Sequence, residues 1–384
     1  MSRTALSVAL ACTLMGSQVP TSSARGPNST ISKTRPKVEI ALLLDTSNSM
    51  DGLINQARTH LWKMVNELEK VRHNGKRPDV YVALYEYGND GLNAEGGHIR
   101  LVHPLTLNLD KIFEELFALT TNGGSEYCGQ VIAKSVDELE WAPHRAMKCI
   151  FIAGNEPFTQ GPVDYQEACK NAAAKNITIT TIHCGPYDEG IQGYWAEPAK
   201  LADGQYLNID QDKAIPHIDA PQDAELTRLS AALNKTYIPY GAAEERKMAV
   251  ARQKAQDANA SNAAPAVAAL RSQTKGSANY RNADWDLVDA LKEKTVKLED
   301  VKQDHLPEEL RKLSKEELKA HIEQKTAERG KIQEQIKELS AARNKYVAAE
   351  QAKLAESGED TLDQAVEKAV HAEAGKRGFE FVEE

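Results

Sequence analysis

The chain has 384 residues, of which 41% are hydrophobic and 27% are charged, as expected for a folded protein with a substantial core. Its formal net charge of -9 argues against a nucleic-acid-binding protein, because such proteins normally present a basic face. The length allows one large domain or two modest ones.

The first 24 residues have the layout of a secretory signal peptide. Arg3 precedes an apolar run from Ala5 to Met15, and small residues continue to Ala24. This run is too short to span a bilayer, and we expect it to be cleaved. The mature protein is therefore predicted to be periplasmic or secreted and not transmembrane. Cys12 leaves a lipoprotein as the alternative, although the leucine usual three residues before such a cysteine is absent.

After a short linker at 25–36, apolar segments and helical patterns alternate from 37 to 215. Strands are expected at 38–45, 79–88, 98–106, 149–157 and 177–185, with a short helix and a last strand within 195–209. Helices are expected at 53–71, 109–118, 130–141 and 164–176. The third strand is short and polar, which favours an edge position. This alternation predicts an α/β fold with a doubly wound, mostly parallel sheet and one active edge.

The composition changes after this region, and we expect a helical C-terminal extension. A helical cap is predicted at 216–241 and a helical, coiled-coil-like region at 284–384. Between them, residues 242–283 are poor in large apolar residues, which predicts a linker or a loosely ordered helix. In the last region a stripe recurs at helical spacing, formed by Ile332, Ile336, Leu339, Tyr346 and Leu354. Such a stripe needs a partner surface, either another helix of this chain or a second subunit through self-association.

Four cysteines follow the predicted signal peptide, namely Cys128, Cys149, Cys169 and Cys184. An even number of cysteines in an exported protein permits disulfides, whose pairing the sequence does not fix. Four buried thiols in the core are the alternative.

The segment "IALLLDTSNSMDGL" places three oxygen-bearing side chains at the end of the first strand. Asp45, Ser47 and Ser49 stand at alternate positions, which can direct their oxygens to one point. Mg²⁺ prefers octahedral oxygen coordination and is usually held by one or two carboxylates. The alternative is that these residues only cap the helix that follows.

This D-x-S-x-S motif after an apolar strand resembles the von Willebrand factor A domain, whose metal-ion-dependent adhesion site begins in this way. The resemblance covers 37–215 and continues at "NGGSEY", where Ser125 stands in place of the usual threonine. It implies that Asp45, Ser47, Ser49 and Ser125 are metal ligands for Mg²⁺ or Mn²⁺. The predicted first and second loops of the site are thus both present.

The third loop of the site departs from the family pattern. In "IAGNEP", which resembles the family's T-D-G-E-P loop, the family's aspartate falls on Gly154, so one carboxylate is missing. Glu126, Asn155 and Glu156 lie nearby in sequence and could supply additional metal-site oxygens. Hard-cation affinity depends on the number of charged ligands, so the change is expected to weaken metal binding.

The resemblance implies cation-dependent protein–protein binding, with an acidic residue of the partner as a further metal ligand. No nucleophile–base pair or nucleotide-binding loop appears in the sequence, so we do not expect an enzyme. The alternative is a metal-independent structural scaffold of the cell envelope, assembled through its C-terminal helices, which Gly154 favours.

Several other residues fall near the same predicted edge of the sheet. Cys128 and Cys184 could form a disulfide there. Tyr194 and Trp195 could form an exposed aromatic rim, although packing in the core is the commoner fate. For His183 we expect a packed, hydrogen-bonded side chain and not a ligand.

Overall fold

A computed structural model describes residues 35–50, 63, 65–143, 146–209, 218–355 and 362–382. The predicted signal peptide at 1–24, most of the linker at 25–36 and most of the helix expected at 53–71 lie outside these residues. The structure therefore does not test those predictions. Within the described residues, no helix has both the length and the apolar character needed to cross a membrane.

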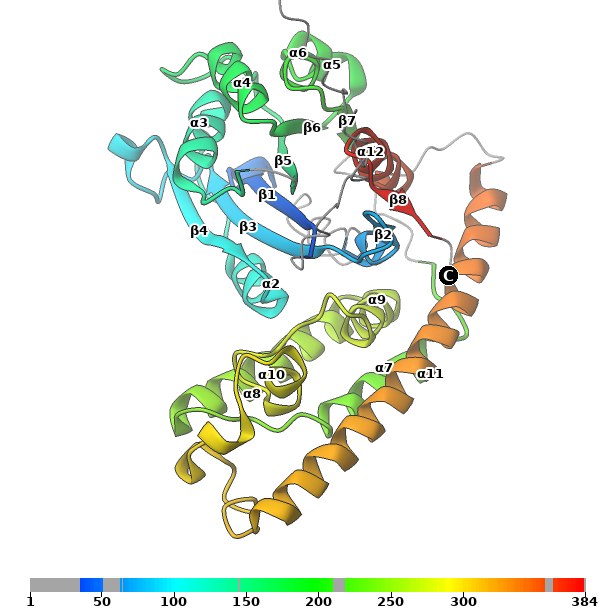
Figure 1. Cartoon of the computed structure of the whole chain (residues 1–384). Helices are drawn as coiled ribbons and strands as arrows, with labels where there is room; N and C mark the ends of the chain where they lie inside the picture. Colours follow the sequence, from blue (N-terminus) through cyan, green and yellow to red (C-terminus); the bar gives the residue numbers. More distant parts are fainter. Residues whose placement is uncertain are drawn as a thin grey trace, which may run out of the picture. The chain divides into compact units, whose positions relative to one another are not determined.

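A six-stranded sheet lies at the centre of the N-terminal half (Figure 1). Its strands are β1 Lys37–Asp45, β3 Asp79–Tyr87, β4 Ile99–Thr106, β5 Ala146–Gly154, β6 Thr178–Cys184 and β7 Tyr206–Ile209. The spatial order is β4-β3-β1-β5-β6-β7, with β4 antiparallel to β3 and all other neighbours parallel. The predicted doubly wound sheet with an edge strand at 98–106 is confirmed. The chain order reverses between β1 and β5, which is where such sheets bind ligands.

Side chains alternate across β1, and each face of the sheet buries its own apolar cluster. The cluster on one face is covered by α3 Cys128–Glu138, α4 Tyr165–Ala174 and α6 Ala196–Leu201, whereas α2 Leu109–Ala118 covers the other. Short elements at the edges complete this half: α5 Tyr187–Gln192 and the 3-10 helices Asn48–Met50 and Ala94–Gly96. Both faces are covered, which explains why β1 and β5 are mostly apolar.

Helices form the second half of the chain, and Figure 1 shows α11 as the longest of them. They are α7 Asp223–Asn234, α8 Ala243–Ala263, α9 Pro265–Gly276, α10 Leu287–Glu293 and α11 Lys315–Ala355, with 3-10 helices Leu298–Asp300 and Gln303–His305. The predicted stripe finds its partner within the chain, because Ile332 and Ile336 of α11 pack against Leu226 and Leu229 of α7. Tyr346 lies at the surface.

Of the two alternatives predicted for 242–283, a linker or a loosely ordered helix, the linker is wrong, because most of these residues form α8 and α9. The expectation rested on the scarcity of large apolar residues. The helices instead bury small side chains such as Ala260 and Ala269, together with the cations Arg271 and Lys275. Opposite charges accompany the buried cations, so a core forms without many large apolar groups.

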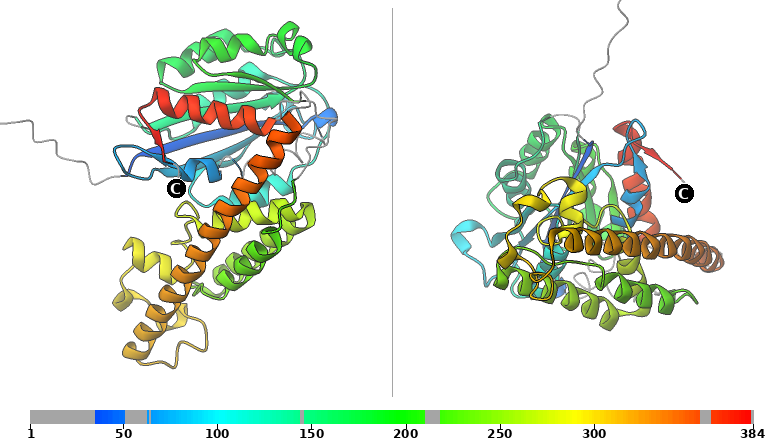
Figure 2. Two further views of the ribbon diagram at one scale, coloured as in Figure 1. Left: turned by 90° about the vertical axis from the view of Figure 1, so that its right-hand side faces the viewer. Right: turned by 60° about the horizontal axis from the view of Figure 1, so that its bottom comes forward.

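The end of the chain does not belong with the other C-terminal helices. Helix α12, Leu362–Lys376, buries Ala369, Val370 and Ala374 in the apolar cluster of one sheet face. Figures 1 and 2 both show α12 across that face. Strand β8, Glu380–Phe381, then pairs antiparallel with β2, Val71–Arg72. The single region predicted at 284–384 is therefore divided between the helical half and the sheet.

All four cysteines of the described chain are free, buried thiols. Cys128 belongs to the apolar cluster on one face of the sheet, and Cys184 belongs to the cluster on the other. The predicted disulfide between these two residues is therefore not formed, and burial raises the pKa of both thiols well above its usual range.

Candidate functional site

Asp45 ends β1 at the point where the strand order reverses, and its side chain is completely buried. The Ser47 backbone N–H donates to Asp45 Oδ1 at 2.7 Å. Asp45 Oδ2 is also buried but has no hydrogen-bond partner within the described structure. A buried carboxylate oxygen without a partner is energetically costly, so it marks a position where a ligand would be favourable.

The two serines of the motif lie beside Asp45, as their spacing predicts. Ser47 is buried and Ser49 is exposed, and their hydroxyl oxygens are 3.2 Å apart. Asn155 Nδ2 donates to Ser49 Oγ at 3.0 Å, while the buried Asn155 Oδ1 has no hydrogen-bond partner among the residues that the structure describes. The third loop therefore contacts the first through Asn155.

Glu126 brings a second carboxyl group to Asp45. The Glu126 side chain is buried, and a Cβ atom on Gly88 would meet both it and the Asp45 carboxylate, so the two side chains lie together. The Glu156 backbone N–H donates to Glu126 Oε2 at 3.3 Å. Ser125, the predicted hydroxyl ligand, is half-buried in a β-bridge with Gly88. Sequence reasoning treated Glu126 as a substitute oxygen, whereas the structure makes it the direct neighbour of Asp45.

Glycines create the space for this carboxyl pair. A Cβ atom on Gly88, whose φ is 82°, would lie 2.6 Å from Asp45 Oδ1 and 2.9 Å from Glu126 Cγ. A Cβ atom on Gly154 would lie 2.5 Å from the Tyr87 hydroxyl, which donates to the Ala153 carbonyl. An aspartate at position 154 would therefore clash with Tyr87, which is a physical reason for the missing loop carboxylate.

Burial makes the two carboxyl groups difficult to ionise together. Burial raises the pKa of Asp45 to about 6, and Glu156 adds a smaller repulsion. Burial, together with the hydrogen bond and the charge of Asp45, raises the pKa of Glu126 to about 10. Two adjacent buried carboxylates need either a shared proton or a cation to offset their charge.

The residues present fit a hard divalent cation. Asp45 and Glu126 supply carboxylate oxygens, and Ser47 and Ser49 supply hydroxyl oxygens, which together match the ligand preference of Mg²⁺ or Mn²⁺. No group of three or more His, Cys, Asp or Glu side chains that could hold a metal occurs among the described residues. A cation at this site would therefore depend on the serine hydroxyls.

The remaining predicted site residues have supporting positions. Glu156 is half-buried, and its Oε2 accepts from Gln160 Nε2 at 3.2 Å. His183 is packed as expected, with Nε2 3.3 Å from the Asn155 carbonyl oxygen, and burial lowers its pKa. Trp195 is completely buried, in agreement with the expected packing in the core, so it forms no aromatic rim, whereas Tyr194 is exposed.

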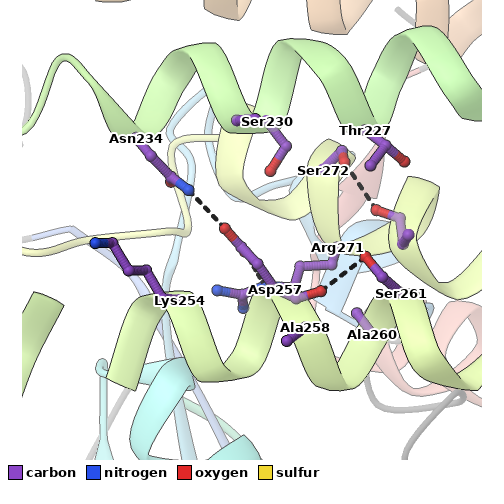
Figure 3. Close-up of a pocket in the computed structure, with 12 residues that line it drawn as sticks. Thr227, Ser230, Asn234, Lys254, Asp257, Ala258, Ala260, Ser261, Arg271 and Ser272 are labelled. Carbon is purple, nitrogen blue, oxygen red and sulfur yellow. Dashed lines mark hydrogen bonds and ion pairs between the residues drawn. The ribbon is translucent and has the colours of Figure 1, made fainter. Parts of the chain in front are cut away.

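A cavity of 270 Å³ between α7, α8 and α9 is a second candidate (Figure 3). Its central carboxylate, Asp257, accepts from Arg271 Nε at 2.6 Å, Lys275 Nζ at 2.9 Å and Asn234 Nδ2 at 2.7 Å. Arg271 Nη1 also donates to Asp110 at 2.7 Å. The charged groups already neutralise one another, so this cavity has a structural explanation, and Asp45 marks the stronger candidate site.

Comparison with known proteins agrees with this fold. Residues 39–199 match the family model of the von Willebrand factor type A domain. BatB from Bacteroides thetaiotaomicron is similar at 18% identity and a TM-score of 0.35, covering 45% of this chain and 90% of that one. The SpRpn10 VWA domain is similar at 14% identity and a TM-score of 0.35, covering 45% and 88%.

An aerotolerance-related membrane protein from Bacteroides fragilis is similar at 16% identity and a TM-score of 0.30, covering 45% of this chain and 92% of that one. No curated protein sequence matches the chain. Residues 39–199 thus match the von Willebrand factor type A domain, and the predicted resemblance is confirmed for that segment.

Proposed function

We propose that the von Willebrand factor type A domain at residues 39–199 makes this chain an exported binding protein that holds a partner protein through a divalent cation. Domains of this type commonly mediate protein–protein interaction. The observation that carries the proposal is the buried Asp45–Glu126 pair, to which no cationic side chain of the described residues bonds.

In this proposal Asp45 and Glu126 are the anionic ligands of Mg²⁺ or Mn²⁺, and Ser47 and Ser49 add hydroxyl oxygens. Ser125, one residue before Glu126, would contribute a further hydroxyl. The bound cation would supply the positive charge that lets both carboxylates remain ionised. An acidic side chain of the partner would take a remaining coordination position.

Export and the absence of catalysis are parts of the same proposal. The predicted signal peptide at 1–24 supports a periplasmic or secreted location, with a lipoprotein through Cys12 as the alternative. His183 Nε2 lies 3.3 Å from the Asn155 carbonyl oxygen, and burial lowers the pKa of the His183 imidazole. This arrangement favours binding over general-base chemistry.

Calorimetric titration of Mg²⁺ and Mn²⁺ into residues 25–384 tests the cation site. We expect binding by the unmodified protein, and loss of that binding in both Asp45→Ala and Glu126→Gln. Glu244→Gln is the control, because Glu244 is an exposed carboxylate on α8. If only Asp45→Ala lost cation binding, the cation site would be supported but Glu126 would not be one of its ligands.

No binding to the unmodified protein would contradict cation dependence. The metal-independent scaffold would then be preferred, and the specific observation in its favour is that Tyr87 occupies the space beside Gly154. That scaffold predicts partner association that survives EDTA. Because α7 covers Ile332 and Ile336 but Tyr346 is exposed, self-association would involve only the later part of the α11 stripe.

A further inference from the structure

We propose that the segment Tyr187–Tyr194 is a docking surface for a basic, arginine- or lysine-bearing segment of a protein partner. Six large apolar side chains are exposed in the described part of the chain, and three of them lie in this segment. They are Tyr187, Ile191 and Tyr194, with relative exposures of 55%, 43% and 51%. We call these three residues, together with Asp188 and Glu189, the α5 platform.

The fold fixes the α5 platform at the same edge of the sheet as Asp45. Helix α5 begins directly after β6, which pairs with β5, and β5 pairs with β1. Tyr187 and Ile191 are four residues apart on one helix and therefore share a face. The Tyr206 hydroxyl donates to the Tyr187 carbonyl oxygen at 3.0 Å, and the two rings lie 5.2 Å apart.

Tyr194 is held in a conformation that a bulky residue rarely adopts. Its φ is 64°, in the left-handed region where glycine is the usual residue. The next residue, Trp195, is completely buried, and its Nε1 donates to the Glu156 carbonyl oxygen at 2.9 Å. The exposed Tyr194 ring adds nothing to the buried core, so its strained backbone conformation points to a role at the surface.

The charges around these rings select the partner. Asp188 and Glu189 are exposed, and neither forms an ion pair within the described structure. From 176 to 199 the sequence contains no lysine or arginine. Aromatic faces attract cations, arginine most often, and neighbouring carboxylates pair with the same groups. An acidic partner segment would be repelled here, whereas a basic one flanked by apolar residues would contact both the rings and the acids.

This surface goes beyond the proposed function, because it needs no cation at Asp45. The test therefore uses buffer with EDTA, so that failure of the cation site leaves the result unaffected. The probe is a fluorescein-labelled peptide, Gly-Arg-Leu-Arg-Gly with a C-terminal amide, followed by fluorescence anisotropy. The matched peptide replaces both arginines by glutamine.

We expect saturable binding of the arginine peptide to residues 25–384 and at least about tenfold weaker binding of the glutamine peptide. The double variant Tyr187→Ala, Tyr194→Ala should weaken binding by about tenfold, whereas Tyr187→Phe should retain it. Asp188→Asn with Glu189→Gln should weaken binding and reduce its salt dependence. Tyr346→Ala on α11 is the control, because Tyr346 is an exposed tyrosine outside the α5 platform.

Equal binding of the two peptides would overturn the proposal, and so would an unchanged affinity in the double tyrosine variant. Absence of binding to the unmodified protein would overturn it as well. Thermal unfolding of each variant verifies that the chain is folded. The substituted side chains are exposed, so a large loss of stability is not expected.

Discussion

Two buried clusters of charged side chains differ in charge balance, and the difference separates a binding site from a structural core. At the end of β1, Asp45 and Glu126 bring two carboxyl groups together without a cation. Among α2, α8 and α9, the buried cations Arg271 and Lys275 alternate with carboxylates. Both clusters are buried, but among the described residues only the second contains side chains of opposite charge that neutralise one another.

The balanced cluster links parts of the chain that are far apart in sequence. Arg271 bonds to Asp110 of α2 and to Asp257 of α8, and Lys275 bonds to Asp257 and to the Ser230 hydroxyl of α7. The cluster therefore fixes the helical half against the sheet half. Among the described residues, the carboxyl pair at Asp45 makes no such connection, and Asp45 Oδ2 has no hydrogen-bond partner.

Removing Asp257, the central carboxylate of the balanced cluster, should cause the largest loss of stability. In Asp257→Ala, Arg271 and Lys275 would remain buried with too little negative charge, and we expect a loss of about 3–5 kcal/mol of stability. Denaturant unfolding monitored by circular dichroism measures this loss. Glu244→Ala on the same helix is the control, because Glu244 is exposed and should change stability by less than about 0.5 kcal/mol. Similar small losses in both variants would contradict a structural role for the cluster.

The pH dependence of stability tests whether burial of the charged Lys275 ammonium group destabilises the folded protein. Burial lowers its pKa to about 8, below the ordinary value of 10.5. The folded state therefore binds fewer protons than the unfolded state between these values, so this group makes stability rise as pH increases through that window.

Unfolding free energies of the unmodified protein and of Lys275→Met, measured from pH 7 to pH 10, isolate this effect. The stability of the unmodified protein relative to the variant should rise with pH, by roughly 2 kcal/mol. Subtracting the variant removes the contribution of other titrating groups, including the buried tyrosines. A difference that stays constant with pH would show that Lys275 titrates normally.

At the like-charged pair, neutralising one carboxyl group should raise the stability of the protein instead of lowering it. Glu126→Gln removes a buried carboxylate beside Asp45, so we expect stability in EDTA to increase, on the order of 1 kcal/mol. Mg²⁺ should stabilise the unmodified protein but not this variant. Thermal unfolding with EDTA and with Mg²⁺ measures both effects, and destabilisation by Glu126→Gln in EDTA would contradict the proposed charge imbalance.

Local sequence patterns predicted the sheet well. The strands at 38–45 and 79–88 match β1 and β3, because residues buried on both faces produce unbroken apolar runs. Asp45, Ser47 and Ser49 also lie side by side as the D-x-S-x-S motif predicted, although the strand ends at Asp45 and Ser49 belongs to the 3-10 helix Asn48–Met50.

Local sequence patterns did not predict the regions whose structure depends on long-range contacts. Residues 243–276 contain few large apolar side chains, and their helices are held in place in part because Asp110 and Asp257 neutralise the buried Arg271 and Lys275. Helix α12 packs on the sheet although its sequence resembles the other charged C-terminal helices. No local pattern reveals such contacts between distant segments.

The sequence by itself determined the strand–helix order, the position of the first loop of the site and the loss of a carboxylate at Gly154. Only the tertiary structure decided that Glu126 lies against Asp45, that Tyr87 occupies the space beside Gly154, and that Cys128 and Cys184 face opposite sides of the sheet. The physical reason is that backbone periodicity is local, whereas burial and charge compensation depend on which distant side chains meet.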